Sequence, residues 1–361
     1  MTGSVGRRRL EALAWLCRAV SPLFPAGTVT APPAVLWPVV VALADQHLLL
    51  PELALALHRH GLAAGAPGDL VALLDDIHAL NRERNAALRA QMRDMAQAFA
   101  AAALAPVWLK GAVELLDPGW ETGGRMMNDL DLWFPDPADQ AAALACLDRL
   151  GYTPMPGEED GAWSGSHHYA GRTHPAWLVR VELHRTIVGR ACDPLLPDHE
   201  ALPALVWQEW EGCRTARLCA RDRVRHSLIQ ATAMAVPRME SGRMPLMKAL
   251  DTVRRCHADF GGTVPPDLAA VLAAPVWADY APPFLTLAER LFGLPNPLVA
   301  DDSMVDRLAV VTATPRLAFL TQTLERLFSR RFLRKLARPT ALPAAFARYA
   351  HAFLTGRDHE G

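Results

Sequence analysis

Apolar residues recur at helical spacing along the first hundred residues of the chain. The clearest run lies between residues 70 and 103, where apolar side chains follow at steps of three and four residues or their multiples: Leu73, Ile77, Leu80, Leu88, Met92 and Met95. This spacing puts them on one side of a helix, and the residues between them are good helix formers. The pattern predicts an all-helical N-terminal region over residues 1–103.

Three segments further along have the pattern of β-strands. Residues 106–109 form a short apolar run, and residues 129–134 and 178–184 alternate between polar and apolar side chains. Alternation with a period of two residues is typical of a strand that buries one face. These segments therefore predict a change from helices to a region that contains a sheet.

One helix is predicted between the second and the third of these strands. Asp136 is placed to cap its start, Pro137 stands in its first turn, and Gly151 follows its last residue. The helix and the strands together predict an α+β core over residues 104–190.

Helical spacing returns after about residue 203, and a C-terminal helical region is predicted over residues 191–361. The clearest helices are expected at 218–236, 243–260, 280–292 and 314–337, with prolines between them. Basic and apolar residues mix at 325–338. That segment is either a surface helix whose arginines pair with acids elsewhere, or a face that binds RNA, acidic lipid or a partner.

Composition narrows the class of protein. The 361 residues include 37 Lys and Arg against 38 Asp and Glu, for a formal net charge of −1, and 51% are hydrophobic. Such a chain is not expected to coat nucleic acid, and it is too apolar for global disorder. No apolar run is long enough to predict a membrane span. The six cysteines are scattered without a Cys-x-x-Cys pair, so reduced thiols and a cytoplasmic location are expected.

The second predicted strand carries two acids on one face. A period of two residues aligns Asp129 with Asp131 and turns the apolar residues between them to the other side. The two carboxylates then stand about 6.6 Å apart along the strand, within reach of two divalent cations about 3.5–4 Å apart. On the third strand the same period aligns Glu182 with His184. If the two strands are neighbours, Glu182 supplies a third carboxylate, which binds the second cation or takes a proton from an acceptor hydroxyl.

Lys110 and Gly111 follow the first strand and precede a predicted helix. A glycine and free backbone N–H groups at the start of a helix favour an anion. We therefore expect Lys110 and Gly111 to bind phosphate.

Four elements in a fixed order resemble a known family. They are Leu109-Lys110-Gly111, the segment 124–132, the helix end Leu150-Gly151-Tyr152 with His167-His168 after it, and Val181-Glu182-Leu183-His184. This set resembles the uncharacterised nucleotidyltransferase family, part of the DNA polymerase beta-like nucleotidyltransferase superfamily. The likeness is strongest over residues 106–186.

The resemblance implies a polymerase-beta-like nucleotidyltransferase core, a small mixed sheet with flanking helices, between the two helical regions. It implies that Asp129 and Asp131 are the metal-binding pair and that Glu182 is the third acidic position. The implied reaction moves a nucleoside monophosphate (NMP) group from a nucleoside triphosphate (NTP) to a hydroxyl or phosphate acceptor, with two Mg²⁺ ions, and releases pyrophosphate.

Two further residues and the acceptor complete the expectations for the site. Arg125 falls where the family carries an arginine before its acidic pair, and a forked guanidinium suits triphosphate oxygens. His184 is expected to orient Glu182 or to face the nucleotide. Because the net charge is near zero, a small molecule or a protein is favoured over RNA as the acceptor.

Two other functions remain open at this point. Four histidines stand close together in the sequence, at positions 167, 168, 174 and 184, and imidazoles beside carboxylates bind Zn²⁺, which is typical of a zinc-dependent hydrolase. No His-Glu-x-x-His spacing accompanies them. The same core would otherwise serve a non-catalytic regulatory or partner-binding protein that binds a nucleotide without turnover.

Overall fold

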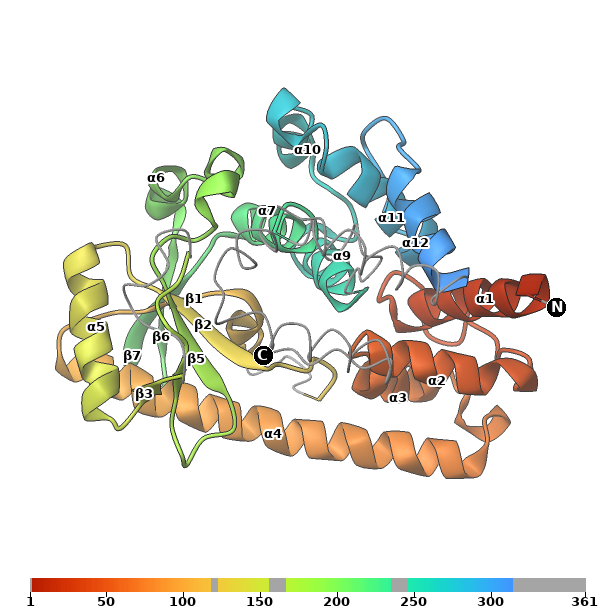
Figure 1. The fold of residues 1–361 in the computed structure, drawn as a ribbon, viewed down its shortest axis with the longest axis horizontal. Coiled ribbons are helices and arrows are strands. Elements are labelled where there is room, and N and C mark those ends of the chain that lie inside the picture. Colours follow the sequence, from red (N-terminus) through yellow and green to blue (C-terminus); the bar gives the residue numbers. More distant parts are fainter. Residues whose placement is uncertain (1, 118–122, 156–166, 235–245, 314–361) are drawn as a thin grey trace, which may run out of the picture.

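The computed structural model describes residues 2–117, 123–155, 167–234 and 246–313 (Figure 1). Over these ranges the chain forms one seven-stranded mixed sheet, with helices before, within and after it in the sequence. This arrangement confirms the α+β fold class. The basic segment 325–338 and the helix expected at 314–337 lie outside the described residues.

The N-terminal region is helical, as the apolar spacing predicts. It contains α1 (Thr2–Val20), η1 (Ala34–Leu36), α2 (Trp37–Gln46), α3 (Leu50–Arg59), η2 (Ala63–Gly65) and α4 (Gly68–Ala101), where η denotes a 3₁₀ helix. The 34-residue α4 runs along one side of the molecule from α3 to the sheet (Figure 1). It therefore connects the N-terminal helices with the α+β part of the chain.

The three predicted strands lie next to one another in the middle of the sheet. The strands, in the spatial order β3-β4-β5-β2-β1-β7-β6, are β1 (Val107–Trp108), β2 (Asp129–Trp133), β3 (Thr153–Pro154), β4 (Arg172–Thr173), β5 (Arg180–His184), β6 (Val206–Trp210) and β7 (Cys213–Arg217). β2 pairs with β1 antiparallel and with β5 in parallel. In that parallel register Asp131 stands opposite Glu182. The second and third predicted strands are therefore neighbours, which is the condition for Glu182 to supply a third carboxylate.

Residues 206–217 correct the prediction that residues 191–361 form a helical region. They form the antiparallel hairpin β6–β7, and β7 pairs in parallel with β1. Glu211 and Gly212 make the turn with φ angles of 51° and 74°, which suits a two-residue hairpin connection. The exposed Trp207 lies on the edge strand, where a one-sided apolar pattern is not required. The sheet therefore extends beyond the predicted end of the core at residue 190.

The helix expected between β2 and β5 is α5 (Pro137–Arg149). Its cap is the predicted one, because the Asp136 carboxylate accepts the backbone N–H of Ala138 at 2.8 Å. Gly151 follows with a left-handed φ of 94°. The remaining helical elements are η3 (Lys110–Leu115), η4 (Arg190–Leu195), α6 (Asp198–Ala201), η5 (Leu202–Ala204), α7 (Ala220–Ala231), α9 (Leu246–Phe260), α10 (Pro266–Leu272), η6 (Pro275–Trp277), α11 (Ala281–Phe292) and α12 (Ser303–Ala313).

Two apolar cores pack against the sheet. Leu130 and Leu132 of β2 join buried residues of α4 and α5, such as Phe99 and Leu147, in one core. Trp133 points to the other side and joins the core built by α1–α3, α7, α9 and α11. Because side chains alternate along a strand, Asp129 and Asp131 share the side of Trp133. The acidic face of the sheet is therefore turned toward the C-terminal helices.

Two further features of the described residues bear on the expectations from sequence. All six cysteines are free thiols, and five of them are buried, as expected. None of the helices in the described ranges has the length and apolar character needed to cross a membrane.

Candidate functional site

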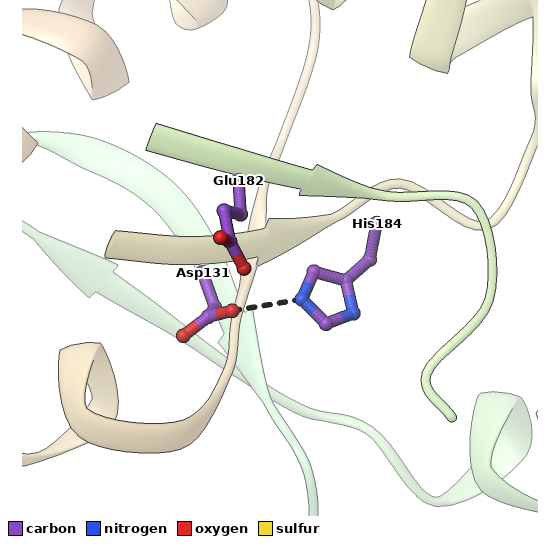
Figure 2. Close-up of side chains that lie close together, drawn as sticks. All are labelled: Asp131, Glu182 and His184. Atoms are coloured by element: carbon purple, nitrogen blue, oxygen red, sulfur yellow. Dashed lines mark hydrogen bonds and ion pairs between the residues drawn. The ribbon is translucent and has the colours of Figure 1, made fainter. Parts of the chain in front are cut away.

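Three of the predicted site residues converge on the acidic face of the sheet. Asp131, Glu182 and His184 each offer one ligand atom, and these atoms lie within 4.8 Å of one another (Figure 2). The three residues are 1%, 6% and 0% exposed. The β2–β5 pairing creates this group, because it sets Asp131 beside Glu182 and places His184 two residues further along the same face. This buried set has the donor atoms to hold a metal ion.

His184 is held from both sides of its ring. Its Nε2 atom lies 2.8 Å from Asp131 Oδ1, and its Nδ1 atom lies 3.3 Å from the backbone carbonyl of Thr186. The rings of His167 and His168 pack against it with centroids 4.9 and 6.1 Å away. These contacts fix the direction in which Nε2 points.

Lys110 supplies a positive charge to the buried acid. Its Nζ donates to Asp131 Oδ1 at 2.5 Å. Burial by itself raises the pKa of Asp131, but Lys110 and His184 outweigh this effect and hold the pKa well below its usual range. Burial lowers the pKa of Lys110, and Asp131, Glu182 and Asp129 more than compensate, so that this pKa is raised. The Lys110–Asp131 pair is therefore ionised.

The other two predicted acids differ in their surroundings. Burial, followed by the negative charge of Asp131, raises the pKa of Glu182. Arg180 bridges the two, with Nη2 at 2.8 Å from Glu182 Oε1 and 3.8 Å from Asp129 Oδ2. The Asp129 side chain is 34% exposed and lies outside the tight group of three. The face thus has a buried part around Asp131 and an open part at Asp129.

A small pocket, partly open to solvent, adjoins this face and is rich in basic side chains. Its lining comes from η3, the segment before β2, α7 and α9: Lys110, Arg125, His226, Ser227, Gln230, Lys248, Asp251 and Arg255. Arg125 pairs there with Asp251, with Nε at 2.9 Å from Oδ1. Lys110 lines the pocket and also contacts Asp131, so the pocket and the acidic group adjoin.

The six lining residues from α7 and α9 were not expected from the sequence. Lys248, Asp251 and Arg255 stand three and four residues apart, a spacing that puts them on one side of α9. Asp251 and Arg255 are buried. The sequence signal for these residues was their helical spacing among apolar positions, which indicates that they are turned toward the protein interior. Which element they pack against depends on the fold.

Arg255 fixes the segment that carries Lys110. Its Nη2 donates to the Lys110 carbonyl at 3.1 Å and to Glu114 Oε1 at 3.0 Å. Next to Lys110, Gly111 is buried, and a Cβ at this position would lie 2.9 Å from the Met127 side chain. A glycine therefore allows η3 and the segment before β2 to approach closely.

Polar side chains of α4 hold the segment that carries Arg125. Asn81 donates to the Gly123 carbonyl at 2.9 Å, and Arg84 donates to the Met127 carbonyl at 2.8 Å. Gly124 packs against Glu52 of α3 so closely that a Cβ would lie 2.3 Å from its Oε1. These contacts could not be predicted from the sequence, because they involve backbone atoms and leave no motif.

The four clustered histidines do not form one metal site. His174 packs against Tyr152, with ring centroids 5.1 Å apart. Within the described ranges, the group of metal-ligating side chains that lie close together contains one imidazole, that of His184, beside two carboxylates. This geometry gives the zinc-hydrolase alternative no set of several imidazoles.

Comparison with known proteins identifies the family. The sequence profile described as "Uncharacterised nucleotidyltransferase" matches residues 33–275, about two thirds of the chain. The chain belongs to this family, which confirms the resemblance. Membership supports transferase activity in general, and the buried acidic group lies within the matched range. A search of curated proteins and a search of solved structures each returned no match.

Proposed function

We propose that this protein is a divalent-cation-dependent nucleotidyltransferase with a polymerase-beta-like core, which moves an NMP group from an NTP to a hydroxyl or phosphate acceptor. The observation that carries the proposal is the buried Asp131–Glu182 pair on adjacent parallel strands, beside a basic pocket, in a chain of a nucleotidyltransferase family. Phosphoryl transfer of this kind combines carboxylate-bound cations with positive charge for the phosphates.

The residues present fit divalent cations. Asp131 and Glu182 offer carboxylate oxygens close together, and Asp129 adds another on the same face toward solvent. Carboxylate oxygens suit Mg²⁺, the ion that the family resemblance implies, and two ions are proposed. Bound there, the cations would neutralise the charge that develops on the phosphate oxygens.

The basic pocket suits the triphosphate of the donor. Lys110, Arg125, Lys248 and Arg255 bring four basic side chains to it, of which three also pair with Asp131, Asp251 and Glu114. An arginine fork and a lysine ammonium are both good ligands of phosphate oxygens. The buried Gly111, which lets Arg125 come near η3, shapes this part of the site.

The transfer step needs an acceptor oxygen to attack the α-phosphorus. The new bond is oxygen to phosphorus, the bond from that phosphorus to the bridging oxygen breaks, and pyrophosphate leaves with the electron pair. With a hydroxyl acceptor, Glu182 either takes the proton on a carboxylate oxygen or helps to hold the second cation. His184 would keep Asp131 in place through its 2.8 Å contact.

Labelled nucleotides test the proposal directly. The purified protein is incubated with each α-³²P-labelled NTP, Mg²⁺ and a panel of small-molecule and protein acceptors, and label transfer and pyrophosphate are measured. We expect transfer by the wild type, a loss of about a hundredfold or more in Asp131→Asn, and no change in Asp267→Asn, an exposed acid of α10. Nucleotide binding with no pyrophosphate release across the panel would instead support the non-catalytic alternative.

A further inference from the structure

His184 gives the buried part of the acidic face a nitrogen donor beside its oxygens. We propose that Asp131, Glu182 and His184 form a mixed oxygen and nitrogen site that binds a first-row transition-metal dication, with Mn²⁺ as the probe, in preference to Mg²⁺. This inference rests on the proposed function only for the reaction that the ion would serve. The experiment that tests it measures ion binding and does not depend on transferase activity.

The three donor atoms are spaced nearly as a single ion requires. Two ligands about 2.2 Å from one ion lie at most about 4.4 Å apart, and the donor atoms of this group lie within 4.8 Å of one another. They come from two paired strands and point toward one another (Figure 2). Any pair of them more than about 4.4 Å apart would have to move together to share an ion.

The hydrogen bonding of His184 favours a ligand role. Both groups that face the ring only accept: the Asp131 carboxylate lies 2.8 Å from Nε2, and the Thr186 carbonyl lies 3.3 Å from Nδ1. Without an ion, Nε2–H donates to the carboxylate. When an ion binds at Nε2, the ring proton moves to Nδ1, where the Thr186 carbonyl accepts it. A backbone carbonyl on the far nitrogen is the usual way in which a metal-binding histidine is oriented. A cation between Nε2 and the carboxylate satisfies both acceptors.

Lys110 already places a positive charge on this group. Its ammonium lies 2.5 Å from the same Asp131 oxygen that faces His184. A buried carboxylate needs a positive partner, and a dication supplies more charge than an ammonium. Lys110 also lines the basic pocket, so its side chain has polar space to turn into when an ion takes its place.

Ligand type and burial favour a transition-metal dication over Mg²⁺ at the one ion position that His184 reaches together with the two carboxylates. Mg²⁺ prefers oxygen ligands and keeps several water molecules, which a group of residues 1%, 6% and 0% exposed leaves little room for. Imidazole nitrogen beside carboxylate oxygen suits transition-metal dications, whose affinity for such sites exceeds that of Mg²⁺. The more exposed Asp129 remains suited to Mg²⁺.

The test measures ion binding to the full-length, metal-free protein. Mn²⁺ binding is followed by electron paramagnetic resonance, Mg²⁺ by competition against it, and spin-echo modulation detects a directly bound ¹⁴N nucleus. We expect Mn²⁺ to bind at least about tenfold more tightly than Mg²⁺, with a ¹⁴N coupling. His184→Gln should lose both the preference and the coupling, whereas His174→Gln, which removes an imidazole outside the group, should keep both.

Three outcomes would overturn the proposal: equal binding of the two ions, a ¹⁴N coupling that survives in His184→Gln, or no ion binding because Lys110 stays on Asp131. If His184→Gln does not fold, Lys110→Gln serves instead, since loss of the competing ammonium should raise Mn²⁺ affinity severalfold; unchanged affinity would contradict the account. Mn²⁺ with the nitrogen coupling but no NMP transfer rejects only the proposed function. NMP transfer without the nitrogen coupling rejects only this inference.

Discussion

Lys110 Nζ lies 2.5 Å from Asp131 Oδ1, so the buried acid of the site has a lysine as its counter-charge. The lysine reaches it from a strained backbone, with a φ of 48°, which is uncommon for a residue other than glycine. The bond from Arg255 to the Lys110 carbonyl holds that backbone in place. The charge balance of the site therefore depends on a short segment fixed by a helix far away in the sequence.

Removing the lysine should destabilise the metal-free protein. Lys110→Met leaves the Asp131 carboxylate buried with a weaker partner, and we expect a loss of about 3 kcal/mol in the free energy of unfolding. Added divalent cation should recover much of this loss, and more than it stabilises the wild type. Urea unfolding with chelator and with Mn²⁺ measures both effects. Arg7→Met, at an exposed ion pair, is the control and should change neither.

The raised pKa of Glu182 predicts how stability changes with pH. A carboxyl whose folded pKa exceeds its unfolded value contributes stability that is present below the unfolded pKa and lost as pH rises through the folded one. Glu182→Gln removes this dependence. In chelator, the variant should gain melting temperature relative to the wild type at pH 8, and this gain should shrink toward pH 4.5. A variant that is less stable at pH 8 and relatively better at pH 4.5 would show that the sign is wrong.

For Asp131 we expect the opposite dependence of stability on pH. Lys110 and His184 lower its pKa against the effect of burial, so its contribution to stability is present above the unfolded pKa and is lost as pH falls through the lower folded one. Asp131→Asn should therefore cost melting temperature at neutral pH, and the deficit should narrow in strong acid. Thermal unfolding from pH 7 to pH 2 in chelator measures this, and a deficit independent of pH would contradict it.

The Arg255–Glu114 pair should show strong energetic coupling. Both side chains are buried, and their ends are 3.0 Å apart. Arg255→Met leaves an unpaired buried carboxylate and should cost about 3 kcal/mol, while the double variant with Glu114→Met should recover a large part of the loss. A double-mutant cycle by urea unfolding gives the coupling. Additive losses would mean that the two side chains act independently.

Gly124 should not tolerate even a methyl group. A Cβ there would lie 2.3 Å from Glu52 Oε1, and Glu52 is buried and paired with Arg254, so it has little freedom to move. We expect Gly124→Ala to cost about 1–3 kcal/mol of stability. Gly189→Ala is the matched control, because its Cβ would meet nothing within 4 Å. Equal stability of the two variants would contradict the close packing.

Local patterns predicted the centre of the sheet well. The alternation at 129–134 and 178–184 fixed which side chains share a face, and β2 and β5 carry them as expected. The cap at Asp136 was readable for the same reason, since a cap depends on neighbours in the chain. The hairpin at 206–217 was missed because its turn, Glu211-Gly212, is not one of the Asn-Gly or Asp-Gly pairs that signal such turns.

Contacts between distant segments were beyond such patterns. The family resemblance and the strand faces led to Asp131, Glu182 and His184. No residue near Lys110 in the sequence indicated that its side chain bonds to Asp131. The part played by α9 was equally hidden. Asp251 and Arg255 reach the site only because α9 packs beside η3 and the segment before β2, and packing of this kind is a property of the whole fold.

A crystal structure with Mn²⁺ and a non-hydrolysable NTP tests the central claim most directly. The account predicts anomalous scattering from an ion within bonding distance of Asp131, Glu182 and His184, with the triphosphate in the pocket lined by Lys110, Arg125 and Lys248. A nucleotide bound elsewhere, or an acidic group with Lys110 still on Asp131 and no ion at saturating Mn²⁺, would contradict it.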